Sequence, residues 1–251
     1  MISSFLERKN ELIRPDVTNV DQILLVSSAK MPDFSFYLLD LFLTIIRFNK
    51  IDAIIVISKI DKLSTMEFEE LKNNMKYYEN LGYKVLYVDS LNKIGIEELK
   101  LSLKDKFTIL SGQTGSGKST LINAIIPEFN LKTQEISQAL GRGKHTTREI
   151  NLYQYENGFI GDTPGFSKLE LIGIKKDNLK NLFPEFHDYH CKFNDCMHQE
   201  NIKGCEVYNA YLNGKILKTR YESYIKMLKE ITQWNYHFQY LILITKILKK
   251  N

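Results

Sequence analysis

The sequence contains few cysteines, no long apolar run, and no internal repeat or low-complexity segment. Three cysteines in 251 residues cannot all pair within one chain, which argues against a disulfide scaffold and favours the reducing cytosol. The two most apolar stretches, 37–48 and 240–248, are interrupted by Asp40 and Lys246 and are shorter than the roughly 20 residues that a membrane span needs. The first 15 residues lack the apolar run of a secretory signal. We therefore expect a cytoplasmic protein with no membrane partner.

What remains is the composition of an ordinary globular chain, with 43% hydrophobic and 25% charged residues, which argues against a mainly disordered chain. Its charge is uneven. Residues 1–170 carry 21 basic and 22 acidic side chains, whereas residues 171–251 carry 13 and 8. A basic C-terminal third suits an anionic partner such as nucleic acid, although a solvated surface has the same composition.

Short apolar runs alternate with helical patterns along the first half of the chain. Continuous runs of this kind are typical of strands covered on both faces, as in a parallel sheet with crossover helices. The predicted strands are 23–28, 53–58, 84–89 and 107–111, and the predicted helices between them are 34–48, 67–80 and 95–104. Two more strands, 150–155 and 158–161, are joined through Glu156-Asn-Gly158, in which the Asn-Gly dipeptide favours a hairpin. The pattern predicts an α/β fold with a doubly wound, mostly parallel sheet.

A glycine-rich segment with the spacing G-x-x-x-x-G-K-S follows the predicted strand 107–111 and precedes a helical run. Glycines let the backbone curl around phosphates, and amide groups at a helix N-terminus face the negative charge. Lys118 would span the terminal phosphates and Ser119 would bind Mg²⁺. The phosphate-binding residues predicted here are Gly112, Gln113, Thr114, Gly115, Ser116, Gly117, Lys118, Ser119 and Thr120.

A second motif, Asp162-Thr-Pro-Gly165, follows the predicted strand 158–161. We expect Asp162 to be a further Mg²⁺ ligand through water, and the Gly165 amide to sense the terminal phosphate. A plain turn has the same residue types, but the position downstream of the phosphate loop favours the nucleotide role.

A third motif indicates that the base is guanine. Ser58, Lys59, Ile60 and Asp61 close the predicted strand 53–58 and match the [N/T/S]-K-x-D pattern. Asp61 would accept hydrogen bonds from the N1–H and exocyclic amine of guanine, which adenine does not present together, and the stem of Lys59 would lie along the base. Asn49–Asp52 fits the same pattern but precedes the strand, whereas ligands bind at the carboxyl ends of strands. Ser90 is expected to make the next contact to the base.

The base-reading motifs precede the phosphate loop, which reverses the usual order in guanine-nucleotide switches and indicates a circular permutation. The chain resembles the ribosome small-subunit-dependent GTPases over about residues 5–232. The resemblance rests on this motif order, on a cysteine cluster at 191–205, and on the segments 8–12, 14–15, 19–22 and 141–148. The resemblance implies a circularly permuted GTPase domain at 19–172, a small helical zinc-binding domain at 173–232, and a tail at 233–251. This family begins with a five-stranded RNA-binding barrel, of which residues 1–18 would be a remnant and linker. Either the barrel was lost or the sequence starts late, and the resemblance leaves open whether ribosome docking is retained.

The segment 141–148 lies where a mobile switch belongs, between the phosphate loop and Asp162. The hydroxyl of Thr146 or Thr147 would complete Mg²⁺ coordination with Ser119 and Asp162 when the γ-phosphate is present. Phe166 stands where Ras-like enzymes carry the glutamine that orients water. The resemblance assigns that role to His145, which could equally contact rRNA.

Cys191, Cys196, His198 and Cys205 supply four ligands of the type that tetrahedral zinc takes, with no open position for catalysis. Three buried thiols and a surface histidine are the alternative. The family has the same arrangement with a slightly shorter last spacing, and zinc would hold the small domain together.

The sequence therefore predicts a monomeric GTPase that binds GTP or GDP with Mg²⁺ and carries one structural Zn²⁺. It would assist late assembly of the small ribosomal subunit, binding rRNA in the GTP state and leaving after hydrolysis. Two alternatives remain open: an ATP-dependent P-loop enzyme, against which Asp61 argues, and a zinc-containing RNA-binding scaffold that binds nucleotide with little turnover.

Overall fold

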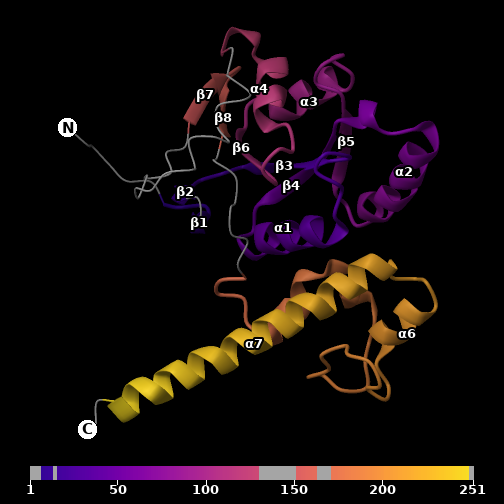
Figure 1. Cartoon of the computed structure of the whole chain (residues 1–251), viewed down its shortest axis with the longest axis vertical. Coiled ribbons are helices and arrows are strands. Elements are labelled where there is room, and N and C mark those ends of the chain that lie inside the picture. Colours follow the sequence, from indigo (N-terminus) through magenta and orange to yellow (C-terminus); the bar gives the residue numbers. More distant parts are fainter. Residues whose placement is uncertain (1–6, 14–15, 130–150, 163–170, 249–251) are drawn as a thin grey trace. The chain divides into compact units, whose positions relative to one another are not determined.

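The structure is a computed structural model that describes residues 7–13, 16–129, 151–162 and 171–248, and it divides the chain into two compact units (Figure 1). The first unit comprises Met1–Ser35 and Asn49–Leu169, and the second comprises Phe36–Phe48 and Glu170–Asn251. The domains expected from the sequence are continuous segments. The observed units are not, because the helix 36–48 groups with the C-terminal part of the chain.

A six-stranded sheet forms the centre of the first unit, with the strand order β5-β4-β3-β6-β8-β7. Five strands are parallel, and β7 runs antiparallel to β8 at one edge. Their bounds are β3 (Gln22–Ser28), β4 (Asp52–Ser58), β5 (Lys84–Val88), β6 (Phe107–Ser111), β7 (Asn151–Tyr155) and β8 (Gly158–Asp162). The predicted α/β fold with a mostly parallel sheet is confirmed.

Both faces of this sheet are buried, which explains why its strands have continuous apolar sequences. Leu24 and Val26 of β3 pack with apolar side chains of α3 (Ile96–Leu103) and α4 (Lys118–Ile125). Ile23 and Leu25 point to the opposite face and are equally inaccessible. The first unit also contains α2 (Thr65–Asn80) and the short helices η1 (Ile60–Lys62) and η2 (Pro127–Phe129).

The hairpin between β7 and β8 is present, and Gly158 has a different role from the one its sequence suggests. The two-residue turn consists of Glu156, at φ 49°, and Asn157, because Tyr155 pairs directly with Gly158. Gly158 is the first residue of β8. A Cβ atom there would lie 2.2 Å from the carbonyl oxygen of Lys106, so the close approach of that backbone requires glycine.

The N-terminal segment contains a two-stranded antiparallel ribbon, β1 (Glu11–Ile13) and β2 (Asp16–Thr18). The Asn10 side chain donates to the carbonyl of Val20 at 2.7 Å and accepts from its amide at 2.9 Å, which closes this ribbon. The Asp21 carboxylate accepts from the Phe107 amide at 2.8 Å, and this bond lowers the pKa of Asp21. These contacts tie the ribbon to the start of β6.

The second unit is helical. Its elements are α1 (Phe36–Phe48), α5 (Lys176–Leu179), η4 (Lys180–Leu182), η5 (Pro184–Asp188), α6 (Glu206–Leu212) and α7 (Lys218–Leu248). The long helix α7 continues without a break through the residues that were expected to form a separate tail from 233 (Figure 1). Within the part of the chain that the structure describes, no helix has both the length and the apolar run to cross a membrane.

A buried arginine joins the helices of the second unit. Arg220 of α7 is inaccessible to solvent, and its Nη1 and Nε atoms donate to Asp40 of α1 and Glu185 of η5, both at 2.7 Å. Its guanidinium group lies 4.3 Å from the ring centroid of Phe183. Removal of one member of a buried ionic group leaves the opposite charge buried with neither a partner nor water. Disruption of this cluster therefore costs considerable folding free energy.

Arg220→Ala is expected to lower the free energy of unfolding of the second unit by about 3–5 kcal/mol, measured by urea denaturation. Lys218→Ala is the matched control, since Lys218 is on the same helix and makes an exposed contact of 3.8 Å with Glu222. The control should change stability by about 0.5 kcal/mol or less. Equal effects of the two substitutions would contradict a role for the buried cluster.

Candidate nucleotide and metal sites

The carboxyl ends of the parallel strands bring the predicted nucleotide residues to one edge of the sheet. In the observed register Ser28 of β3 pairs with Ser58 of β4, whereas Leu25 already pairs with Ser111, the last residue of β6. Strand β3 therefore extends three residues, about 10 Å, beyond the end of β6. This step leaves room for the loop after β6, where strand order also changes direction, as is usual for ligand sites in such sheets.

The phosphate loop leaves β6 by bending toward β3. A Cβ atom on Gly112, which has φ 141°, would lie 2.1 Å from the carbonyl oxygen of Val26, so only glycine fits there. Gly117 caps the N-terminus of α4, and Lys118 and Ser119 follow it. Ser119 and Thr120 are half-buried in the first turn of this helix, and residues 113–115 of the loop are exposed. The loop thus has the strand-loop-helix arrangement that its sequence predicts.

Lys118 is folded back onto its own loop. Its ammonium group donates to the carbonyls of Gly112 at 2.9 Å and Gln113 at 3.0 Å, and the side chain is 9% exposed. Burial lowers the pKa of Lys118, whereas the charge of Asp162 acts in the opposite direction. Burial likewise raises the pKa of Asp162 at the end of β8, opposed by Lys118. The two groups favour each other's charged form, as an anion- and cation-binding pair requires.

The predicted base-reading segment is hydrogen-bonded to the phosphate loop. The Ser58 hydroxyl donates to the Ser116 carbonyl at 2.6 Å, and the Lys59 ammonium donates to the Gly115 carbonyl at 2.7 Å. Lys59 also donates to the carbonyl of Met31, a residue that sequence analysis did not single out because a backbone carbonyl leaves no side-chain signal. With these bonds, the end of β4 and the phosphate loop form one connected surface.

Ile60 and Asp61 lie in η1, directly after Lys59. The Asp61 carboxylate is paired with the Lys62 ammonium at 2.9 Å. The competing Asp52 begins β4 and pairs with Gln22, the first residue of β3, so it lies at the opposite end of the strand from Ser58. Asp52 is therefore a strand-entry residue, at the end of β4 away from Ser58 and its hydrogen bond to the phosphate loop.

Ser90 is half-buried in the turn after β5. This turn is organised by Asp89, whose Oδ1 accepts from the amides of Leu91 at 3.0 Å and Asn92 at 3.1 Å. Asp89 is a structural residue that the sequence did not reveal. Of the other predicted site residues, His145, Thr146, Thr147 and Gly165 lie outside the described residues, as does Phe166.

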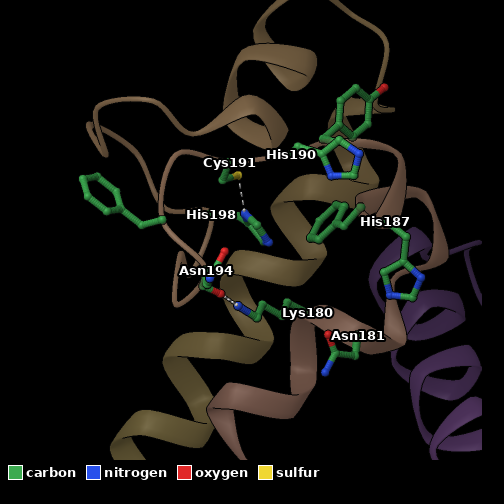
Figure 2. A pocket seen from close by; sticks show the side chains of 10 residues that line it. Lys180, Asn181, His187, His190, Cys191, Asn194 and His198 are labelled. Carbon is green, nitrogen blue, oxygen red and sulfur yellow. Dashed lines mark hydrogen bonds between the residues drawn. The ribbon is translucent and has the colours of Figure 1, made fainter.

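The four predicted metal ligands come together in the second unit. The ligand atoms of Cys191, Cys196, His198 and Cys205 all lie within 4.8 Å of one another. The Cys191 and Cys205 sulfurs are 3.9 Å apart, too far for a disulfide bond of about 2.05 Å. The His198 Nδ1 atom lies 3.4 Å from the Cys191 sulfur and 3.7 Å from that of Cys205. Figure 2 shows His198 directed toward Cys191.

These distances fit a tetrahedral cation. Zinc bonds of about 2.3 Å to sulfur and about 2.0 Å to nitrogen would place two sulfurs about 3.8 Å apart, and a sulfur and a nitrogen about 3.5 Å apart. Burial lowers the pKa of His198 to about 4, helped by the nearby Lys180, so the imidazole is neutral and can act as a ligand. Burial raises the pKa of the Cys205 thiol to about 12, so its thiolate form needs a cation near neutral pH.

Contacts around the cluster orient the ligands. The Tyr208 amide donates to the Cys205 sulfur at 3.3 Å. From α7, the Tyr221 hydroxyl donates to the His198 carbonyl at 2.6 Å and the Tyr224 hydroxyl donates to the Met197 carbonyl at 2.8 Å. Lys180 donates to the carbonyls of Asn194 and Cys196 at 2.9 and 3.1 Å. Such outer contacts fix ligand orientation at metal centres, and a Cys₃His group that can hold a metal ion is present here.

A phosphate loop joined to a guanine-type motif that precedes it in the chain defines a P-loop GTPase of circularly permuted order. Comparison with known proteins gives the family: residues 5–172 match RsgA GTPase, and the chain belongs to this family of GTPases. The protein is therefore a GTPase that binds guanine nucleotides.

Three relatives illustrate the similarity. The "Small ribosomal subunit biogenesis GTPase RsgA" of Phytoplasma australiense is 50% identical over 234 residues, which cover 92% of this chain and 75% of the relative. The crystal structure of YjeQ from Thermotoga maritima matches with a TM-score of 0.78 at 37% identity, covering 90% of this chain and 77% of that one. The crystal structure of YloQ, described as a circularly permuted GTPase, matches with a TM-score of 0.76 at 35% identity, covering 91% and 74%.

Cys196→Ser and Cys205→Ser are each expected to remove the bound metal, measured as metal content per chain after dialysis, because four donors are needed to close the site. Loss of metal should also lower the melting temperature of the second unit while GTP affinity of the first unit is retained. His190→Ala is the matched control, since this exposed histidine adjoins Cys191 but is not part of the Cys₃His group. Chelation that neither releases metal nor alters the melting curve would contradict a structural metal centre.

Proposed function

We propose that the protein is a GTP-hydrolysing factor for late assembly of the small ribosomal subunit in the cytoplasm, which binds rRNA in the GTP state and dissociates after hydrolysis. The observation that carries the nucleotide part of this proposal is the pair of hydrogen bonds from Ser58 and Lys59 to the phosphate loop. They connect the segment that would read guanine to the segment that would hold the phosphates. The ribosomal part rests on relatives that are named small ribosomal subunit biogenesis GTPases.

In this function Asp61 and Ser90 hold the guanine base, and the residues 112–120 hold the phosphates. A phosphate oxygen would take the place of the loop carbonyls that now accept from Lys118. Ser119, Thr147 and Asp162 are the proposed ligands of Mg²⁺, which would neutralise charge on the phosphates. The Gly165 amide would contact the terminal phosphate. These assignments support a switch in which the γ-phosphate orders residues between the phosphate loop and Asp162.

Hydrolysis requires a group that orients water, and Phe166 cannot do so at the position after the D-x-x-G motif. We propose that His145 takes this role, with Thr146 beside Thr147 in the switch segment. Because no other polar group is assigned to the water, hydrolysis by the isolated protein would be slow and would accelerate when the small subunit positions His145.

We also propose that the metal of the Cys₃His group is Zn²⁺. Three thiolates and one imidazole form a soft donor set, which favours zinc over Mg²⁺ or Ca²⁺. Its role is structural, since all four tetrahedral positions are filled by protein atoms.

Asp61→Asn is expected to weaken GTP binding by about 100-fold, because an amide cannot accept both hydrogen bonds from the guanine edge. It should strengthen binding of xanthosine triphosphate, whose C2 carbonyl accepts from an amide. Fluorescent-nucleotide competition measures both affinities. Asp52→Asn is the matched control and should leave GTP affinity within about twofold, because Asp52 lies at the far end of β4. Equal competition by ATP and GTP on the natural chain would contradict guanine selectivity.

GTP hydrolysis by the full chain is expected to rise at least about tenfold when purified small subunits are added. His145→Ala should lower the stimulated single-turnover rate by about 100-fold while nucleotide binding is retained. If the His145→Ala variant hydrolyses GTP on the small subunit as fast as the natural chain, His145 has no catalytic role, and an rRNA contact remains as its function. Binding of GTP with no turnover under either condition would instead favour the scaffold.

A further inference from the structure

A hollow adjoins the Cys₃His group in the second unit, and Cys191 and His198 of that group are among the residues that line it (Figure 2). Its volume is about 260 Å³. Side chains from η4 and η5 form one wall, and the segment around Phe193 and Asn194 forms another. This volume lies just below the range of about 300–1,000 Å³ for ligand pockets, so it suits a single small group.

The described residues that line the hollow include no carboxylate. They include three aromatic side chains, Phe186, Tyr189 and Phe193, and two carboxamides, Asn181 and Asn194. Phe193 is 50% exposed, and the Lys192 ammonium lies 5.7 Å from its ring centroid, so the ring is accessible and has a cation beside it.

Cationic and hydrogen-bond-donating groups converge on the same space. Lys180 uses two ammonium protons on the carbonyls of Asn194 and Cys196, which fixes the side chain and leaves its third proton for an acceptor in the hollow. His187 and His190 line the hollow and are exposed. His198 points its Nδ1 atom at the cysteines, so its other ring nitrogen faces the hollow (Figure 2). A metal-bound histidine donates from that nitrogen, which adds an oriented N–H.

We propose that this hollow binds one unpaired nucleotide of RNA. The base would stack on Phe193 and exchange hydrogen bonds with Asn181 and Asn194, since carboxamides match the donor and acceptor groups of base edges. The adjoining phosphate would lie near Lys180 and His187. The inference rests on the proposed function in so far as the RNA would be rRNA, but the site is separate from the nucleotide-binding loops.

Other ligand classes fit less well. An acidic peptide would match the positive charge but not the carboxamides and exposed ring. Double-stranded RNA keeps its bases stacked and presents only phosphates and the shallow groove, so it could not fill a pocket of this kind. The net positive charge of residues 171–251 is in line with an RNA partner.

The test uses the full metal-loaded chain and fluorescein-labelled single-stranded RNA octamers, oligo-U and oligo-A, in anisotropy titrations. The variant combines Asn181→Ala, His187→Ala and Phe193→Ala. The matched control combines Leu212→Ala, which removes a 62% exposed apolar side chain, with Lys215→Gln, which removes an exposed charge in the same unit. We expect the variant to bind about tenfold or more weakly than the natural chain, and the control to bind within about twofold.

Two further measurements locate the contact. An octamer containing 4-thiouridine should cross-link on irradiation to a peptide within residues 187–194, and a duplex of the same sequence should bind the natural chain and the variant equally. Equal binding of single-stranded RNA by the natural chain and the variant, or cross-links confined to other segments, would overturn the proposal. So would tighter binding of an octaglutamate peptide than of either RNA.

The outcome is distinguishable from failure of the proposed function. Intrinsic GTP hydrolysis without ribosomal subunits should be equal in the natural chain, the variant and the control, since none of the substituted residues lies in the nucleotide site. If the subunit stimulates the variant normally and RNA binding is also unchanged, the pocket proposal fails while the GTPase role stands. If RNA binding falls and stimulation is absent even in the natural chain, the pocket stands and the ribosomal role fails.

Discussion

The parallel register of the central sheet is the constraint on which the nucleotide site depends. It brings the carboxyl ends of β3, β4, β6 and β8 to the same edge of the sheet, so that Ser58, the loop after Ser111 and Asp162 share that edge. Such a site is defined by neighbouring strand ends and not by the order in which the chain visits them. A permuted sequence can therefore retain a GTPase site, provided that the strand order is preserved. The hydrogen bonds from Ser58 and Lys59 to the phosphate loop directly connect the end of β4 with the loop that follows β6.

The second unit depends on polar centres that all include α7. Arg220 binds Asp40 and Glu185, and one residue later Tyr221 supports the carbonyl of the metal ligand His198. The Tyr37 hydroxyl donates to Glu230 farther along the same helix at 2.7 Å. Such contacts add specificity to the helical second unit, since each polar group has few alternative partners in a buried site. The metal group and the ionic cluster thus stabilise neighbouring turns of one helix.

Much of this architecture could be predicted from the sequence, because the relevant signals are local. Continuous apolar runs gave the strands within one or two residues, and the phosphate loop and the Cys₃His cluster are short motifs with characteristic spacings. The failures involve long-range contacts. Nothing near Asp40 indicates a partner 180 residues away in Arg220, so the grouping of α1 with the second unit was not foreseen. The Met31 carbonyl that accepts from Lys59 was missed because main-chain acceptors exist at every position.

The placement of α1 has a consequence for modularity. The polypeptide passes between the two units three times, after Ser35, after Phe48 and after Leu169. A GTPase domain excised at the apparent C-terminal boundary would retain α1 but lose the guanidinium that accompanies its buried Asp40. Exchange of the metal-binding part between homologues would also separate Arg220 from Asp40, unless the matching α1 were exchanged together with it. The two units are distinct folded bodies, but no single cut in the sequence separates the residues of one from those of the other.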